Sequence, residues 1–226
     1  REKKDVEHDE RLHLVCEEAT KFFESKLQAH EAVKKYLETR GVQAETVSAW
    51  RLGYAPAQWR ELSEYLLQKG YTKEEMKMVN ETQKEILAKK LLKELGNVDG
   101  LKIAVWGLSF KPNTDDMRSA PSIAIIEKLL SKGAKISAYD PIATREAKKV
   151  FNNRIEFSEN MYDCLNGAEA LLLVTEWSQF KEPDFVKIKK LLKRPLVVDG
   201  RNIYSPAKMR EIGFTYISIG RSDVRC

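Results

Sequence analysis

The spacing of apolar residues in the first part of the chain is helical. From Glu10 to Leu27 apolar residues return every three or four positions, which is typical of an amphipathic helix. Gly41 and the Gly53–Pro56 segment interrupt the pattern that follows, because glycine can end a helix and proline cannot continue one. Shorter helices are therefore expected over 30–39, 45–52 and 58–68. Residues 1–71 are predicted to form a small all-α domain.

A long connecting helix is predicted next, over residues 72–96. Thr72 and Glu75 have the spacing of a capping box, in which a hydroxyl and a carboxylate satisfy free N–H groups at a helix start. No Gly or Pro follows until Gly96, and the apolar positions keep a helical spacing. Such a helix would join the two parts of the chain rigidly.

In residues 97–226 short apolar runs alternate with helical segments. Strands are expected at 102–107, 135–139, 155–157, 170–175, 196–199 and 215–219. Helices are expected at about 119–132, 143–150, 160–166, 184–192 and 206–212. Strand–helix–strand units give right-handed parallel crossovers. The predicted fold class is α/β: a doubly wound, parallel, six-stranded Rossmann-like sheet, preceded by the all-α domain and the connecting helix.

Composition limits the classes of protein. The 226 residues are 42% hydrophobic and 32% charged, which suits a soluble globular chain. No apolar run approaches the roughly 20 residues of a membrane span, so no membrane partner is expected. Cys16, Cys164 and Cys226 are scattered, which favours a reducing cytoplasm and argues against structural zinc. The positive charge lies mainly in residues 79–226, with 25 Lys and Arg against 19 Asp and Glu.

Three polar motifs follow strand ends and supply the candidate chemistry. Phe110-Lys111, Glu176-Trp177 and Arg201-Asn202 each come after a predicted strand, and the carboxyl ends of parallel strands share one edge of a sheet. Lys and Arg at that edge suit a diphosphate, and Phe suits a sugar or base. The fingerprint G-x-G-x-x-G does not follow Gly107, so no cofactor, metal or catalytic residue is assigned.

The motif sequences carry a resemblance. The motifs that carry the resemblance are V-W-G-L-S-F-K-P-N-T-D-D-M-R-S-A-P-S, A-Y-D-P, L-V-T-E-W, V-D-G-R-N and V-N-E-T-Q. Residues 79 to about 221 resemble the C-terminal UDP-sugar-binding domain of UDP-glucose dehydrogenases and related nucleotide-sugar dehydrogenases. The resemblance implies that Phe110 and Lys111 belong to the substrate-binding loop and that Arg201 contacts the UDP-sugar. It offers three secondary candidates, which are Asn113, Arg118 and Asn202.

This sequence lacks two features that the family needs for its reaction. The family oxidises its substrate through a catalytic Cys in a G-G-x-C-x-x-K-D setting and with NAD held by a first domain, and neither is present. The resemblance therefore implies a nucleotide-sugar-binding part that is not competent alone, with a homodimer possible through the connecting helix. Cys164 is expected to be a small buried residue on a helix.

Residues 9 to about 76 resemble a different family. The segment A-V-K-K-Y-L-E-T-R-G-V-Q through W-R-L-G-Y-A-P resembles the start of the RNA-polymerase domain of bacterial DNA primases. Single-stranded DNA binding through Arg51, Tyr54 and Trp59 is one alternative function. A net charge near −1 over residues 1–78 disfavours it, and Trp50, Tyr54 and Trp59 are expected to be packing residues. The other alternative is a structural chimera, natural or engineered, with no retained activity.

Several further residues near the strand ends are expected to be structural. Asp115 and Asp116 are adjacent, so they point apart, and helix capping is favoured over acid–base work. Asp140 is expected to make a turn before Pro141, although it stands where a ribose-binding acid would. Trp177 and Phe180 are expected to pack in the core.

Overall fold

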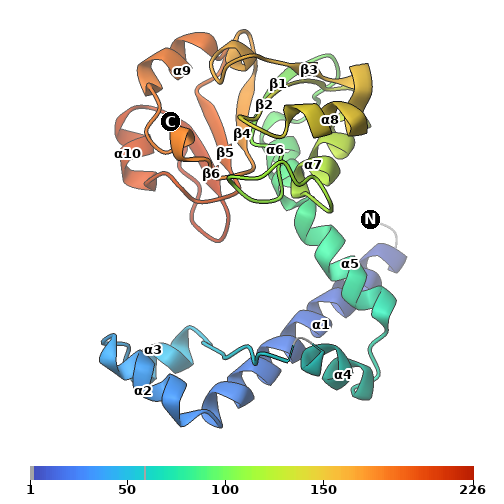
Figure 1. The fold of residues 1–226 in the computed structure, drawn as a ribbon, viewed down its shortest axis with the longest axis vertical. Coiled ribbons are helices and arrows are strands. Elements are labelled where there is room, and N and C mark those ends of the chain that lie inside the picture. Colours follow the sequence, from blue (N-terminus) through green and yellow to red (C-terminus); the bar gives the residue numbers. More distant parts are fainter. Residues whose placement is uncertain (1–2, 59) are drawn as a thin grey trace. The chain divides into compact units, whose positions relative to one another are not determined.

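The computed structural model describes residues 3–58 and 60–226, with side chains from residue 10 onward. The chain divides into two compact units, Arg1–Gln83 and Lys84–Cys226 (Figure 1). In the described residues no helix is both long and apolar enough to cross a membrane.

The first unit is all-α, as predicted. Its helices are α1 (Lys3–Gln28), α2 (Glu31–Thr39), α3 (Ala44–Ala49), α4 (Glu61–Gln68) and α5 (Lys73–Lys84). The core is small: Val15, Leu66 and Tyr71 are buried, with Met76 and Val79 packed beside them. The predicted capping box starts α5, since the Thr72 N–H donates to Glu75 Oε2 at 2.7 Å and the Glu75 N–H donates to Thr72 Oγ1 at 3.1 Å.

The aromatic residues of this unit only partly follow the expectation. Tyr54 packs edge-on against His30 with ring centroids 4.5 Å apart, and it is half-buried. The prediction that Trp50 packs in the core is wrong: its side chain is 77% exposed, because α3 ends at Ala49 and leaves Trp50 as the residue after the helix. Trp59 lies outside the described residues.

The connecting segment is not one helix. The structure divides it at Glu85 into α5 and α6 (Ile86–Leu95). The physical reason is that the two pieces serve different cores. Met76 and Val79 of α5 pack in the first unit, whereas Leu87, Ala88 and Leu91 of α6 are buried against the sheet of the second.

The second unit is a six-stranded parallel sheet in the order β3-β2-β1-β4-β5-β6, which confirms the predicted fold class. The strands are β1 (Lys102–Trp106), β2 (Lys135–Tyr139), β3 (Glu156–Phe157), β4 (Ala170–Leu173), β5 (Leu196–Asp199) and β6 (Thr215–Ser218). The helices are α7 (Pro121–Leu130), α8 (Thr144–Phe151), α9 (Phe185–Leu191) and α10 (Pro206–Glu211), with 3-10 turns η1 (Asn152–Arg154), η2 (Asp163–Leu165) and η3 (Ser178–Phe180).

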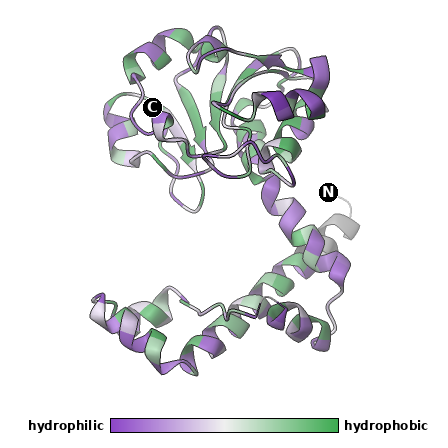
Figure 2. Cartoon of the chain, in the orientation of Figure 1, coloured by the Kyte–Doolittle hydropathy of each residue, from purple (hydrophilic) through white to green (hydrophobic). Residues whose placement is uncertain are grey.

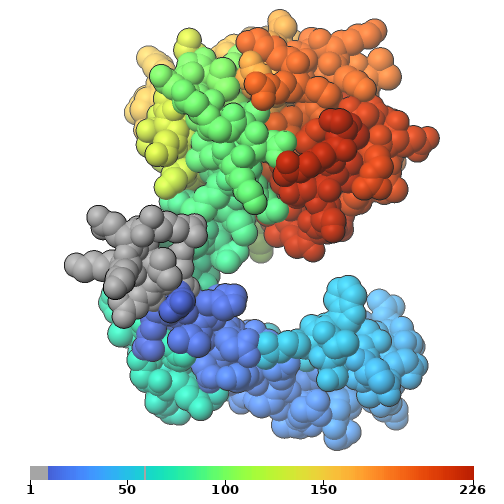
Figure 3. All heavy atoms as spheres, turned by 180° about the vertical axis from the view of Figure 1, so that it is seen from behind, coloured from blue at the N-terminus to red at the C-terminus, as the bar shows by residue number. Residues whose placement is uncertain are grey.

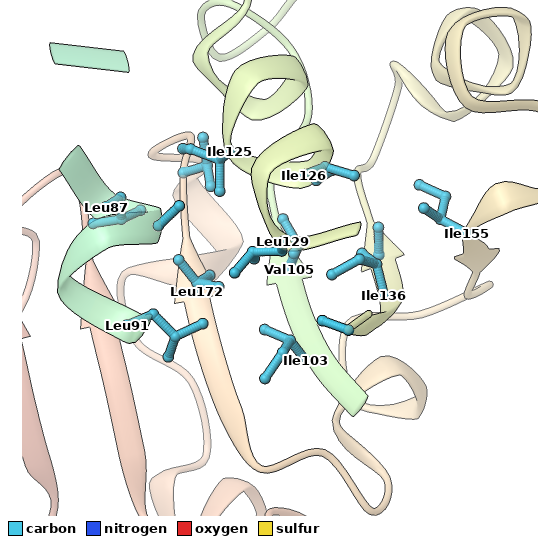
Figure 4. Packing of buried hydrophobic residues seen from close by; sticks show 14 of the residues in the cluster. Leu87, Leu91, Ile103, Val105, Ile125, Ile126, Leu129, Ile136, Ile155 and Leu172 are labelled. Atoms are coloured by element: carbon cyan, nitrogen blue, oxygen red, sulfur yellow. The ribbon is translucent and has the colours of Figure 1, made fainter. Parts of the chain in front are cut away.

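Both faces of the sheet are covered. Along β1, Ile103 and Val105 join one core cluster, while Ala104 and Trp106 join the other, as the two-residue period of a strand requires. The strands are accordingly apolar along their length (Figure 2). Figure 4 shows the first cluster, in which side chains of α6 and α7 meet those of the sheet: Leu87, Leu91, Ile125, Ile126 and Leu129 against Ile103, Val105, Ile136 and Leu172.

The outer edge of the sheet at β6 is covered by the C-terminal segment. Tyr216 and Val224 form an antiparallel bridge, with N–H to O distances of 2.8 and 2.9 Å. The C-terminal residues lie on the surface beside the last elements of the chain (dark red in Figure 3). Pairing of this kind blunts an edge strand that would otherwise be open to another chain.

One predicted helix of this unit is wrong. Residues 160–166 contain only the 3-10 turn η2. The Asn160 side-chain oxygen accepts hydrogen bonds from the N–H groups of Tyr162 and Asp163, both at 3.0 Å. Gly167, which follows the turn, has a positive φ of 70°. An Asn that bonds nearby backbone and a closely following Gly leave no room for a full helix. Cys164 is fully buried as expected, but on this turn.

Candidate functional site

The loops that follow β1, β4 and β5 carry the predicted ligand residues. These strands are neighbours and parallel, so their carboxyl ends lie at one edge of the sheet. The structure therefore brings Phe110-Lys111, Glu176-Trp177 and Arg201-Asn202 to the same edge, as the sequence predicts. In doubly wound sheets this edge is where ligands bind, at the point where the connections change direction.

A close approach joins the first two loops. Gly107 has φ 88°, and a Cβ atom there would lie 2.6 Å from the backbone N of Thr175. Only glycine tolerates both the positive φ and that contact. The Thr175 hydroxyl then donates to the Ser109 carbonyl at 2.6 Å. The backbone of Gly107 and Thr175 thus occupies the space just beyond the carboxyl ends of β1 and β4.

Asp140, at the end of β2, is a buried carboxylate with many donors. Its Oδ1 accepts the N–H groups of Ile142 (2.9 Å) and Ala143 (2.7 Å), which confirms the predicted turn. Its Oδ2 accepts the Leu108 N–H at 2.7 Å and the Trp177 indole N–H at 3.1 Å. Sequence reasoning predicted only the local turn and missed this second set, because Leu108 and Trp177 lie 32 and 37 residues away from Asp140 in the sequence.

Phe110 and Lys111 lie on the surface. Phe110 is 44% exposed, and Lys111 Nζ stands 5.8 Å from its ring centroid. The Phe110 N–H donates to the Asp116 carbonyl at 2.8 Å, which folds the loop back on itself. Within the described part of the chain Lys111 Nζ has no carboxylate partner, so its charge is available to an anion.

Arg201 is held by a carboxylate. Its Nη2 donates to Glu176 Oε1 at 2.6 Å, and its Nε contacts Glu176 Oε2. Partial burial is the largest single effect and acts to raise the pKa of Glu176, but the hydrogen bonds from Arg201 and from backbone, together with the charges of Arg201 and Lys181, lower the pKa overall. Asp199 fixes the backbone, since its Oδ1 accepts the Arg201 N–H at 2.8 Å. The pair uses one edge of the guanidinium and leaves the Nη1 end for other acceptors.

The secondary candidates make structural contacts. The Asn202 amide donates to the Ile219 carbonyl at 2.9 Å and accepts the Ile219 N–H at 3.0 Å, which ties this loop to the end of β6. Arg118 binds Asp116 through Nε at 3.0 Å and Nη2 at 2.9 Å, and these bonds lower the pKa of Asp116 to about 2. Asn113 is exposed with φ 63°. Their contact with a ligand stays a prediction.

Other expected structural residues are where the sequence placed them, with one difference. Trp177 and Phe180 are buried, at 4% and 0% exposure. Asp116 is structural, but it binds Arg118 and does not cap the following helix, whose N-cap is Ala120. A hollow of about 720 Å³ is lined by Asp115, Asp116 and Arg118 together with residues of α8. Phe110, Lys111 and Arg201 are not part of its lining.

Comparisons with known proteins agree with both resemblances. Residues 104–206 match the UDP-glucose/GDP-mannose dehydrogenase family, UDP binding domain. Residues 22–89 match the DNA primase catalytic core, N-terminal domain. The primase-like match continues beyond residue 76, where the sequence motifs suggested that it ends, and reaches into α6.

Individual relatives give the same picture. UDP-glucose 6-dehydrogenase of Pseudomonas aeruginosa is 45% identical over 164 residues, covering 68% of this chain and 36% of the relative. UDP-glucose 6-dehydrogenase TuaD of Bacillus subtilis is 44% identical over 146 residues, covering 65% of this chain and 32% of the relative. The chain thus spans about a third of the length of these curated relatives.

Among solved structures, a UDP-glucose dehydrogenase from Pyrobaculum islandicum aligns with a TM-score of 0.57. The alignment covers 97% of this chain and 51% of that one, at 24% identity, so it supports the fold alone. By sequence, residues 104–206 are thus similar to the UDP binding domain of the UDP-glucose/GDP-mannose dehydrogenase family, and residues 22–89 are similar to the N-terminal domain of the DNA primase catalytic core.

Proposed function

We propose that the second unit binds a UDP-sugar, with Lys111 and Arg201 at the diphosphate and Phe110 against the sugar or base. The observation that carries this proposal is that all three residues lie in the segment matching the UDP binding domain, on loops at one sheet edge. Lys111 supplies a positive charge that no carboxylate among the described residues pairs with. Arg201 keeps its Nη1 group for a phosphate oxygen while Glu176 holds its other edge.

NAD does not fit this unit. A dinucleotide would need glycine-rich backbone that approaches the pyrophosphate and a free acid for the ribose. Here the turn at Gly107 is packed against Thr175, and the Asp140 carboxylate already accepts backbone and indole N–H groups. The proposal therefore assigns the chain no cofactor of its own, while NAD belongs to the parent dehydrogenase family.

Oxidation of the sugar is not proposed for this chain alone. Burial raises the pKa of Cys164 to about 12, so this thiol is not a nucleophile at neutral pH. Cys226 Sγ lies 3.4 Å from the Phe214 carbonyl, at the amino end of β6 and therefore at the opposite edge of the sheet from the strand-end loops. The chain is proposed to bind the nucleotide sugar in the cytoplasm, and turnover would require catalytic parts that these residues do not provide.

Titration calorimetry with UDP-glucose tests the binding proposal. Lys111→Ala and Arg201→Ala should each weaken binding by about tenfold or more, because a hydrogen bond to a charged group contributes roughly 1.5–3 kcal/mol. Lys132→Ala, at an exposed lysine after α7, removes the same charge away from the edge and should leave affinity unchanged. No heat with the native protein, or equal effects of all three variants, would count against the site. NADH formation should stay at background.

A homodimer through residues 72–96 is also proposed. Leu87, Ala88 and Leu91 are already buried within the second unit, so a partner would contact the exposed side of α5 and α6, where Met78 is 41% exposed. Sedimentation equilibrium should show a dimer, and Met78→Glu should shift it toward monomer. A monomer at all concentrations would contradict this part of the proposal.

Single-stranded DNA binding by the first unit is a second candidate. The primase match and the exposed Trp50 favour it, because exposed aromatic residues can stack on bases. Arg51 speaks against it, since its guanidinium is bound by both Glu17 and Glu24. Fluorescence anisotropy with labelled single-stranded DNA, at low and high salt, separates the candidates. Binding that Trp50→Ala abolishes would establish this function.

A further inference from the structure

Asp140 is hydrogen-bonded to the loop that carries Lys111 and to the loop whose Glu176 binds Arg201. The carboxylate is 3% exposed and stands at the end of β2, next to neither Lys111 nor Arg201 in sequence. Its hydrogen bonds go to the β1 loop, to the β4 loop and to the turn after its own strand. A buried carboxylate that satisfies N–H groups from three connections fixes those connections relative to one another.

The first link leads to Lys111. Asp140 Oδ2 accepts the backbone N–H of Leu108 at 2.7 Å and that of Ser109 at 3.2 Å. Ser109 is held from its other side as well, because its carbonyl accepts the Thr175 hydroxyl. Lys111 is only two residues further along the same loop, so the position of its backbone depends on these bonds.

The second link leads to Arg201. The same Oδ2 accepts the indole N–H of Trp177 at 3.1 Å, and Trp177 is 4% exposed. Its chain neighbour Glu176 holds the Arg201 guanidinium at 2.6 Å. The Asp140 carboxylate is therefore connected to both cations indirectly. It is connected to Lys111 through the loop backbone, and to Arg201 through the Trp177 indole and the Glu176–Arg201 ion pair.

We propose that Asp140 is a positioning residue of the nucleotide-sugar site, which sets the spacing between Lys111 and Arg201 so that both meet one diphosphate. The inference rests on the proposed function. Two cations bind the same diphosphate more tightly when the loops that carry them are already ordered, because ordering a loop on binding costs affinity. Asp140 itself touches no ligand in this arrangement, and its Oδ1 atom makes the turn at Ile142 and Ala143.

Asp140→Asn is the decisive variant. The amide places an NH₂ group where N–H donors point and leaves a neutral acceptor, so the loops are held less firmly. UDP-glucose affinity, measured by calorimetry, should fall about 3- to 10-fold. In this background Lys111→Ala and Arg201→Ala should each cost less than in the native protein. Amide exchange at Leu108 and Ser109 should be faster without any ligand.

A matched control removes a negative charge from the same loop without removing the hydrogen bonds that Asp140 makes. Asp115 lies exposed on the same loop, and the Asp115→Asn variant should leave both affinity and amide exchange unchanged. Trp177→Phe deletes only the indole donor, and it serves if Asp140→Asn fails to fold. It should weaken binding and reduce the contribution of Arg201, while that of Lys111 is kept.

The outcomes are separable. If the native protein takes up no UDP-glucose, the proposed function fails and this inference fails with it. If the native protein binds but folded Asp140→Asn binds equally well, only the positioning role is overturned. The same holds if Lys111→Ala and Arg201→Ala keep their full cost in the Asp140→Asn background, or if amide exchange at Leu108 does not change.

Discussion

At the scale of single residues, position 107 requires glycine because of a contact with a residue distant in sequence. Gly107 combines φ 88° with a contact in which an added Cβ would lie 2.6 Å from the Thr175 backbone. Gly167 has a similar φ of 70°, but its Cβ would meet nothing within 4 Å. A side chain at position 167 would therefore meet backbone strain alone, whereas one at position 107 would meet both strain and a steric clash.

Gly107→Ala should destabilise the second unit by more than Gly167→Ala. Strain at positive φ costs Gly167→Ala about 1 kcal/mol. Gly107→Ala adds a clash with backbone, which the β1 and β4 loops can relieve only by moving apart, so it should also weaken UDP-glucose binding. Urea unfolding gives the free energies, and equal losses for the two variants would contradict the role of the Thr175 contact.

Cys164 should respond to pH through its burial. Desolvation raises its pKa from 9.0 to about 12 in the folded chain. A raised pKa means that its contribution to stability is complete below pH 9 and is lost as the pH rises through about 12, because only the unfolded chain then ionises.

Thiol labelling and unfolding measure this behaviour. Near neutral pH the exposed Cys226 should react with a thiol reagent, whereas Cys164 should react only after urea unfolding. Cys164→Ala should reduce the fall in stability between pH 9 and 12. Rapid labelling of Cys164 in the folded protein would show that the thiol is not buried.

At the scale of elements, α6 belongs to the sheet. Its apolar side supplies Leu87, Ala88 and Leu91 to the core, while none of the residues of α5 is buried. This difference explains why a continuous helical pattern in the sequence becomes two helices, because each piece follows the core that it packs on. The local hydrophobic period is the same in both and could not show the division.

Leu91→Ala should therefore destabilise the second unit. Leu91 is fully buried, and removing such a side chain costs about 2–5 kcal/mol through lost burial and the cavity left behind. Lys93→Ala, two residues along on the exposed side, should change stability by less than about 0.5 kcal/mol. Urea unfolding followed by near-ultraviolet circular dichroism distinguishes the two, and equal effects would place α6 outside this core.

At the scale of the whole molecule, each unit has its own core. The buried clusters of the second unit draw on residues from Leu87 to Val224, and the cluster of the first on residues from Val15 to Val79. Each unit can therefore satisfy its apolar residues by itself. The proposed ligand residues all belong to the second unit.

A protein limited to residues 84–226 should fold and bind UDP-glucose as the full chain does, within about twofold. The reason is that α6, the sheet and all three strand-end loops are retained. Circular dichroism and calorimetry provide the measurement. Loss of affinity in a folded fragment would mean that residues 1–83 contribute to the site, and failure to fold would mean that the second core is incomplete.

The amino-acid sequence by itself determined the order and type of most elements, the parallel sheet and the edge at which Lys111 and Arg201 lie. These follow from hydrophobic periods, glycine and proline positions and motif spacing, which act over short stretches of chain. It also determined the capping box at Thr72, because both partners lie within one turn.

Only the tertiary structure decided what crosses between loops: the donors of Asp140, the Glu176–Arg201 pair, the tie from Asn202 to β6 and the exposure of Trp50. The same holds for the division at Glu85. These features depend on which strands become neighbours and which core each helix meets. Residues distant in sequence acquire partners only when the sheet order brings their loops together, and no local pattern encodes that order.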